Sequence, residues 1–256
     1  MTMGKITLVL TDIDGTIVSL GLHDPTPAVR QAIKDVQDAG IQLTAATGRP
    51  YEMTKDLFDD LGLKGFSIFD GGATIRDIQT GEFAWQNWLE VDRLKAIANI
   101  LLPYSTLIDF FPTFHEVLPK DTSTNDIIEK APYVFAFVRA EHRREVEHRL
   151  AELSDLSLHI GPERKDMPGV FDIQITDINS DKFHATNVLR KIVRSSKAET
   201  LAIGDSTNDL PLFRNAGVKV AMGNAMDELK AKADYIVNAL DEDGFAEAMH
   251  RFVLTS

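Results

Sequence analysis

The organisation of this 256-residue chain follows from nine residues near its N-terminus, Leu8-Val9-Leu10-Thr11-Asp12-Ile13-Asp14-Gly15-Thr16. The apolar run at residues 6–10 is short and rich in branched side chains, which is typical of a strand buried on both faces of a parallel sheet. Two acids end the run, and Gly15 allows a sharp turn behind them. We therefore expect two carboxylates at the carboxyl end of a central strand, where open α/β sheets bind their ligands.

Two carboxylates held so close together repel each other unless a cation or a proton lies between them. A bound Mg²⁺ ion, which takes oxygen ligands, would supply the positive charge and could also carry a substrate phosphate. The alternative is that Asp12 caps a turn and that Asp14 is solvated. The short motif alone does not choose between these interpretations.

The composition restricts the classes of function. Hydrophobic residues make up 44% of the chain and charged residues 26%, as in globular proteins of one or two domains. The net charge of −12 argues against a nucleic-acid partner, because phosphate backbones require a basic face. The absence of cysteine excludes disulfides and thiolate metal sites and fits a cytoplasmic location. No apolar run is long enough for a membrane span or a signal peptide, so we expect no membrane partner.

Strand and helix patterns alternate in two separate parts of the chain. Strands are predicted at residues 6–10, 41–46, 66–69, 200–203, 218–222 and 235–237. Helices are predicted from Pro27 to before Gly40 and at residues 51–61, 180–193, 210–215, 226–231 and 244–252. This alternation predicts an α/β fold with a doubly wound, Rossmann-like parallel sheet.

The pattern changes between these two parts. Strands that alternate polar with apolar residues, such as 156–160 and 170–176, predict an antiparallel sheet with one solvent-exposed face. Helices are predicted beside it at residues 91–102 and 141–153. We therefore predict a core formed by residues 1–80 and 179–256, and a separate α+β insert formed by residues 81–178.

Polar side chains follow four of the predicted core strands, and Lys182 lies near a helix start, where its charge opposes the helix dipole. Parallel strands have their carboxyl ends at one edge of the sheet, so these groups are expected to converge. They are Asp12 and Asp14, Thr47, Asp70, and Asp205 with Asp209.

These polar residues also have structural interpretations. The hydroxyl of Thr47 could have no role beyond a hydrogen bond within a turn, and Asp70 could be a turn residue at a strand end. Arg49 could touch a phosphate or substrate, or pair with a surface acid. Asp205 and Asn208 could be plain helix caps.

Taken in order, the motifs are DxDGT at residues 12–16, a strand-end hydroxyl at Thr47, a lysine at Lys182 and GDxxND at residues 204–209. With these four motifs the chain resembles the haloacid dehalogenase-like (HAD) superfamily of phosphotransferases. The insert resembles the α/β cap of the Cof-type phosphatase branch, to which sucrose-phosphate and mannosyl-3-phosphoglycerate phosphatases are similar. The resemblance implies a HAD-like core with an inserted cap that governs substrate specificity.

The resemblance also implies roles for the motif residues. Asp12 would attack phosphorus and form an aspartyl phosphate, and Asp14 would act as general acid and then as general base. Thr47 and Lys182 would complete the catalytic set by binding the phosphoryl oxygens. The Mg²⁺ ligands would be Asp12, Asp14 through its backbone carbonyl, Asp205 and Asp209. The substrate-binding set would be Thr47, Gly48, Arg49, Lys182 and Asn208.

The function implied is a Mg²⁺-dependent phosphatase of small phosphorylated metabolites, namely sugar or polyol phosphates. Two alternatives remain open: a phosphomutase of the phosphomannomutase type, and a non-catalytic binding protein on the same fold. The sequence does not specify an oligomeric state.

Two departures from the branch pattern concern the leaving-group pocket. Phe183 follows Lys182 where the branch commonly has glycine, and Gly71-Gly72-Ala73 stands where it commonly has Asn-Gly-Ala, with Asp70 as a potential replacement for the missing polar group. Polar residues in predicted cap loops are candidates for leaving-group contacts. They are His115, Glu116, Lys120, Asp121, Arg164 and Lys165.

Overall fold

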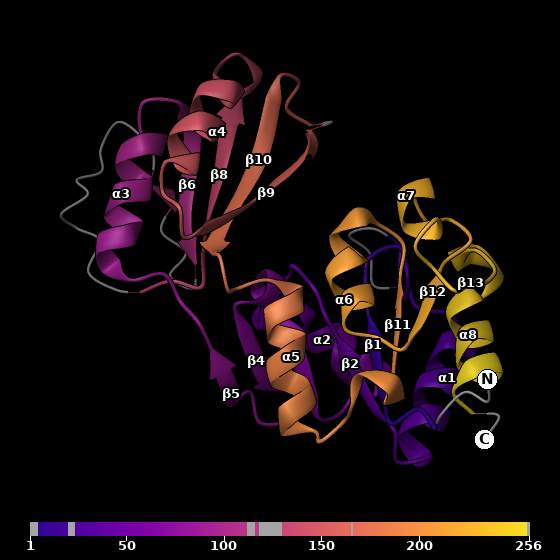
Figure 1. Cartoon of the computed structure of the whole chain (residues 1–256). Helices are drawn as coiled ribbons and strands as arrows, with labels where there is room; N and C mark the ends of the chain where they lie inside the picture. The colour runs from indigo at the N-terminus through magenta and orange to yellow at the C-terminus, as the bar shows by residue number, and fades with distance from the viewer. Residues whose placement is uncertain (1–4, 20–23, 112–115, 118–129, 165, 255–256) are drawn as a thin grey trace. The chain divides into compact units, whose positions relative to one another are not determined.

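The computed structural model describes residues 5–19, 24–111, 116–117, 130–164 and 166–254 (Figure 1). The chain divides into two compact units. The core unit comprises Met1–Trp85 and Lys182–Ser256, and the inserted unit comprises Gln86–Asp181. Within the described ranges, no helix is both long and apolar enough to cross a membrane.

The core unit is built on five parallel strands, β1 (Leu8–Thr11), β2 (Gln42–Ala45), β11 (Thr200–Gly204), β12 (Val218–Ala221) and β13 (Tyr235–Ile236). Their order across the sheet is β13-β12-β11-β1-β2. Leu8 of β1 is in register with Thr200 on one side and with Gln42 on the other. All four residues of β1 are buried, which confirms the prediction of a central strand covered on both faces.

The strand β3 differs from the prediction that it continues this parallel sheet. It belongs to a short antiparallel sheet with the order β3 (Phe66–Phe69), β4 (Thr74–Asp77) and β5 (Phe83–Gln86). It meets the end of β2 at one isolated parallel bridge, between Ala46 and Ile68. Beside this bridge the backbone N–H of Ala45 donates to Ser67 Oγ (3.1 Å). A side-chain hydroxyl thus replaces a backbone carbonyl, and the regular parallel ladder is interrupted.

The helices of the core unit are α1 (Pro27–Asp38), α2 (Tyr51–Leu61), α5 (Lys182–Ile192), α6 (Leu210–Arg214), α7 (Asp227–Lys230) and α8 (Gly244–Phe252). As predicted, α1 begins with Thr26 as its N-cap, whose Oγ1 accepts a hydrogen bond from Val29 N (3.2 Å). Helix α2 ends at Gly62, which adopts the left-handed conformation with φ of +64°. Helix α1 packs beside α8, and α5 packs beside α6 (Figure 1).

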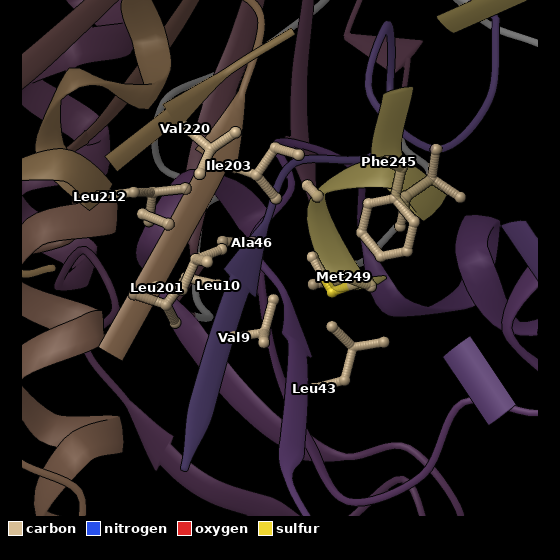
Figure 2. Close-up of a cluster of buried hydrophobic side chains, with 14 of the residues drawn as sticks. Val9, Leu10, Leu43, Ala46, Leu201, Ile203, Leu212, Val220, Phe245 and Met249 are labelled. Atoms are coloured by element: carbon tan, nitrogen blue, oxygen red, sulfur yellow. The ribbon is translucent and has the colours of Figure 1, made fainter. Parts of the chain in front are cut away.

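The apolar core of this unit joins the sheet to its helices (Figure 2). Val9 of β1 and Leu43 of β2 belong to the same buried cluster as Phe245 and Met249 of α8. Each of these four side chains is at most 1% exposed. Burial of apolar side chains from strands and helices far apart in the sequence stabilises the sheet and fixes the positions of the loops at its edge.

The described part of the inserted unit is an antiparallel sheet with two α-helices. Its strands are β6 (Ser105–Phe111), β7 (Glu116–Val117), β8 (Tyr133–Arg139), β9 (Leu156–Glu163) and β10 (Val170–Asp177), in the order β7-β6-β8-β10-β9. The helices α3 (Val91–Leu101) and α4 (Arg143–Ala151) share a buried cluster with the sheet, in which Ile97 and Val146 pack with Val134 and Ile173. The residues between the buried ones of β8, such as Phe135, are only partly buried. This pattern fits the expected sheet with one open face.

We expect Phe245→Ala to lower the free energy of unfolding by about 3–5 kcal/mol, because removal of a fully buried ring leaves a cavity in the core. Urea denaturation measures this change. The control Met53→Ala, at a side chain 57% exposed, should change the free energy by less than about 0.5 kcal/mol. An effect of Phe245→Ala as small as that of the control would mean that α8 does not pack against the sheet.

Candidate active site

Asp12, the first acid of the N-terminal motif, lies directly after β1 and is 6% exposed. Its backbone N–H donates to the carbonyl oxygen of Ile203 (3.2 Å), which extends the pairing of β1 with β11 by one residue. The chain then turns at Gly15, where φ is +82°. A Cβ at Gly15 would lie 2.3 Å from Asp205 Oδ2. Only glycine therefore fits where the two acidic loops approach each other.

Lys182 binds two of the acids. Its Nζ donates to Asp12 Oδ1 and to Asp209 Oδ1, each at 2.8 Å. The exposed fractions of the three side chains are 6%, 8% and 0%. A buried cation in the first turn of a helix is unfavourable by itself, and the two carboxylates offset that penalty. The pattern-based expectation that strand-end acids and Lys182 converge is met at these three residues.

Asp209 is held from its other oxygen by the loop after β11. Its Oδ2 accepts hydrogen bonds from the backbone N–H groups of Asp205 (3.1 Å) and Ser206 (3.2 Å). Ser206 and Asp209 form a capping box at the short helical turn Thr207–Asp209. Ser206 is therefore the cap, and the alternative that Asp205 or Asn208 is a plain helix cap is wrong.

Asn208 differs in exposure from the buried Asp209 that follows it. It is exposed, and its Oδ1 accepts a hydrogen bond from Ser206 Oγ (2.6 Å). Gly204 is the last residue of β11, where a Cβ would lie 2.4 Å from Asp209 Oδ2. The glycine lets the buried carboxylate fold back over the end of β11.

The carboxylates of Asp12, Asp205 and Asp209 form the candidate metal site. One oxygen from each lies within 4.8 Å of the others. Both oxygens of Asp209 already accept hydrogen bonds, whereas Asp205 accepts only a long one, from Thr16 Oγ1 (3.4 Å), among the described residues. Asp12 and Asp205 therefore have the oxygens with most capacity to bind a cation, and Asp209 holds Lys182 and the loop in place.

The electrostatics of this cluster favour a divalent cation. Burial, together with repulsion from Asp209, raises the pKa of Asp12 to about 7, and the charge of Lys182 acts against that rise. Burial and repulsion from Asp209 raise the pKa of Asp205 to about 6. Burial lowers the pKa of Lys182, but attraction to Asp12 and Asp209 outweighs it, so the pKa is raised and the lysine stays charged. Three acids and one lysine leave excess negative charge, which hard oxygen-binding cations neutralise best.

Thr47 lies at the neighbouring strand end, after β2, and is 2% exposed. Its backbone N–H donates to Ile68 O (3.0 Å), and its Oγ1 accepts a hydrogen bond from the backbone N–H of Arg49 (3.0 Å). The hydroxyl thus serves the turn and keeps its own proton for donation. Gly48, at the tip of this turn, is exposed.

Arg49 pairs with the second acid of the N-terminal motif. Its Nε and Nη2 donate to the two carboxylate oxygens of Asp14, at 2.9 and 2.5 Å. The exposed fractions of the two side chains are 15% and 21%. Arg49 therefore pairs with an acid, as one of its two interpretations held. That acid is Asp14 of the motif and not a surface acid. Asp14 is not free in solvent, which overturns the alternative that it is solvated.

The carboxylate of Asp70 is buried beside Thr74. Asp70 is 2% exposed, has φ of +57°, and its Oδ2 accepts a hydrogen bond from Thr74 Oγ1 (2.7 Å). Its Oδ1 is buried without a hydrogen-bond partner among the described residues. Burial raises the pKa of Asp70 to about 6, although the bond from Thr74 acts against the rise. Its backbone N–H donates to Arg49 O (3.2 Å), so it braces the turn that carries Thr47.

Two residues of this region were given no role of their own in the sequence analysis. Thr16 contacts Asp205, as described above. Asn224 donates from Nδ2 to Gly15 O (2.9 Å) and accepts at Oδ1 from Leu240 N (2.9 Å). Asn224 thus ties the acidic loop to the turn before α8. Its position two residues after the predicted strand at 218–222 was the available signal.

The candidate leaving-group residues in the inserted unit are described only in part. His115, Lys120, Asp121 and Lys165 lie outside the described residues, and of Glu116 only the backbone is described. Arg164 pairs with Asp166 (2.6 Å) and lies over the ring of Phe137, 4.3 Å from its centroid.

Comparison with known proteins gives concordant results. The family model of haloacid dehalogenase-like hydrolases matches residues 9–149 and 104–249. The 5-amino-6-(5-phospho-D-ribitylamino)uracil phosphatase YcsE of Bacillus subtilis (strain 168) is 27% identical, over 97% of this chain and 96% of that protein. A phosphoglycolate phosphatase of Methanothermobacter thermautotrophicus is 26% identical, over 96% and 98%. A solved haloacid dehalogenase-like hydrolase from Bacteroides thetaiotaomicron superposes with a TM-score of 0.78 at 25% identity, covering 96% of this chain and 99% of that one.

We expect wild-type protein to lose stability relative to Asp70→Asn as the pH rises from about 4 to about 7. The pKa of this carboxyl is raised in the folded state, so the folded chain binds a proton that the unfolded chain has released. Stability is therefore lost as the pH rises toward the folded pKa of about 6. The difference between the two proteins should change by roughly 1–3 kcal/mol, measured by urea unfolding across this range.

The control for this experiment is Asp56→Asn, at an exposed acid on α2. Its unfolding curve should run parallel to that of wild type at every pH. If Asp70→Asn also runs parallel to wild type, the carboxyl of Asp70 is not buried as described.

Proposed function

Because this chain belongs to the haloacid dehalogenase-like hydrolase family, we propose that it is a Mg²⁺-dependent phosphatase that hydrolyses small phosphate monoesters through an aspartyl phosphate. The observation that carries the proposal is the buried cluster in which Lys182 joins Asp12 to Asp209 beside Asp205. Such a cluster places one nucleophilic carboxylate among groups that bind cations and phosphoryl oxygens.

In the proposed reaction a carboxylate oxygen of Asp12 attacks phosphorus and the bond from phosphorus to the ester oxygen breaks. The departing oxygen takes a proton from the protonated form of Asp14, and the carboxylate that remains is the form that pairs with Arg49. In the second half, Asp14 takes a proton from water, whose oxygen attacks phosphorus, and the bond to Asp12 breaks. Inorganic phosphate and the alcohol are released, and both acids return to their starting states.

Lys182 and Thr47 have supporting roles in this proposal. Lys182 stays charged next to Asp12, where it can hold a phosphoryl oxygen as charge develops. Thr47 Oγ1 retains a proton that it can donate to another phosphoryl oxygen. Asp12, Asp205, Asp209 and the backbone carbonyl of Asp14 would hold the Mg²⁺ ion. When bound, the ion would supply positive charge that keeps Asp12 ionised and screens its approach to an anionic ester.

The proposed substrates are phosphate esters of sugars or polyols. Among the relatives, one is named for a phosphorylated ribityl compound and another for phosphoglycolate, both of them small phosphorylated metabolites. We propose that the inserted unit, Gln86–Asp181, acts as the cap that selects the leaving group. A cytoplasmic location belongs to the same proposal and is supported by the absence of cysteine.

A phosphatase screen over a panel of phosphorylated metabolites, with Mg²⁺ present, tests the proposal by measuring release of inorganic phosphate. Formation of an isomeric phosphate without release, in the presence of a bisphosphate activator, would identify a phosphomutase instead. No turnover of any ester would leave a binding protein as the function and would contradict the proposal.

We expect chelation of divalent cations to reduce turnover by about 100-fold or more and added Mg²⁺ to restore it. Asp205→Asn should weaken Mg²⁺ binding, measured by calorimetry, by about 10-fold or more because it removes a charged oxygen ligand. The control Asp227→Asn, at an exposed acid of α7, should bind Mg²⁺ like wild type. Full activity after exhaustive chelation would exclude the metal requirement.

We expect Asp12→Asn to reduce turnover to near background with little change in melting temperature, because an amide is not a nucleophile toward phosphorus. With an isotopically chiral phosphoryl substrate and an acceptor alcohol, wild type should give net retention at phosphorus. Two in-line displacements restore the configuration, whereas direct attack by water or alcohol inverts it. Net inversion would therefore rule out the aspartyl phosphate.

A further inference from the structure

Arg49 and Asp14, which are 35 residues apart in the sequence, form a bidentate ion pair. Each of the two carboxylate oxygens accepts from an N–H group of Arg49, so the planes of the guanidinium and the carboxylate are fixed relative to each other. A lysine in place of Arg49 would bind the same charge without fixing that plane. The pair therefore controls orientation as well as charge.

Both partners are mounted on turns that are themselves held. The backbone of Arg49 donates to Thr47 Oγ1 (3.0 Å) and accepts from Asp70 N (3.2 Å). On the other side, the backbone at Asp14 forms a bridge with Val18. The ion pair thus connects two braced loops, one after β2 and one after β1.

A proton-transfer group works only when its oxygen lies within hydrogen-bond reach of the atom that gives or takes the proton. The side chain of Asp14 rotates about two single bonds, so an unrestrained carboxylate would adopt several orientations, of which only some suit proton transfer. The guanidinium of Arg49 removes that freedom. Lys182, by contrast, holds Asp12 and Asp209, so the two cations restrain different acids.

We infer that Arg49 is the positioning residue of Asp14, and that it supports turnover by orienting this acid rather than by binding the phosphoryl group. This inference rests on the proposed function, in which Asp14 passes a proton to the leaving oxygen. It assigns Arg49 a role apart from the substrate-binding set in which the sequence places it.

We do not expect folding of the protein to depend on the ion pair between Arg49 and Asp14. Both side chains keep some contact with solvent, at 15% and 21% exposed, so water can solvate the carboxylate of Asp14 when Arg49 is replaced. Variants of Arg49 are therefore expected to fold, and their kinetics report on the reaction. Melting temperature and Mg²⁺ affinity, measured by calorimetry, should match those of wild type and establish that the remaining site is intact.

The test is a series of phosphate esters with increasingly basic leaving groups, from dinitrophenyl phosphate to an alkyl phosphate, at saturating Mg²⁺. Arg49→Gln should lower kcat about 10- to 100-fold for the alkyl ester, because its poor leaving group needs the proton. The loss for the dinitrophenyl ester should be under about 3-fold, because that group leaves without protonation. For the alkyl ester, the kcat of Arg49→Lys should lie between those of wild type and Arg49→Gln, because lysine keeps the charge and loses the bidentate contact.

A double-variant cycle with Asp14→Asn completes the test. Arg49→Gln should cause no further loss in the Asp14→Asn background if it acts through Asp14. The matched control is Arg30→Gln, which breaks another Arg–Asp pair of the core unit, with Asp60. It should leave kcat unchanged for every ester.

Three results would overturn the inference, and they differ in what they mean for the proposed function. Equal losses across the ester series, or a full further loss in the Asp14→Asn background, would mean that Arg49 binds the phosphoryl group, with the proposed function intact. If Asp14→Asn itself slows all esters equally, Asp14 is not the proton donor, and that part of the proposed function fails together with the inference.

Discussion

The salt bridges from Lys182 Nζ to Asp12 and Asp209 are the interactions on which the polar edge of this sheet depends. Without the lysine, acids that are almost fully buried would repel each other at close range and lose their solvation at the same time. Even with the lysine, burial and neighbouring charge raise the pKa of Asp12 to about 7. The arrangement therefore remains short of positive charge, and this shortage is what a bound cation would relieve.

Close approach of the acidic loops is possible because side chains are absent at two positions. A Cβ at Gly15 would collide with Asp205, and a Cβ at Gly204 would collide with Asp209. The buried hydrophobic cluster below, shared by β1, β2 and α8, holds these loops at a fixed separation (Figure 2). Packing of the core and chemistry at its edge are thus linked: apolar burial supplies the free energy, and the glycines let it bring charged groups together.

Arg49 and Lys182 divide the control of charge at this edge. Lys182 is deeply buried between two carboxylates, whereas Arg49 meets Asp14 where both side chains retain some contact with solvent. A point charge suits the first position, since it touches two separate acids. A planar fork suits the second, since it fixes one carboxylate through both oxygens.

Local patterns in the sequence determined much of this protein. The period of apolar residues predicted β1 and the bounds of α2 and α8, the Thr26-Pro27 pair predicted the start of α1, and the strand-end acids predicted where a polar edge would form. Only the tertiary structure decided how these groups are paired. It separated β3 from the parallel sheet, gave the cap of the 204–209 loop to Ser206, buried Asp70, and joined Arg49 to Asp14. The reason is physical: a strand or a cap depends on residues a few positions apart. Lys182 and Asp12 are 170 residues apart and meet only when β1 and α5 have packed into the same core.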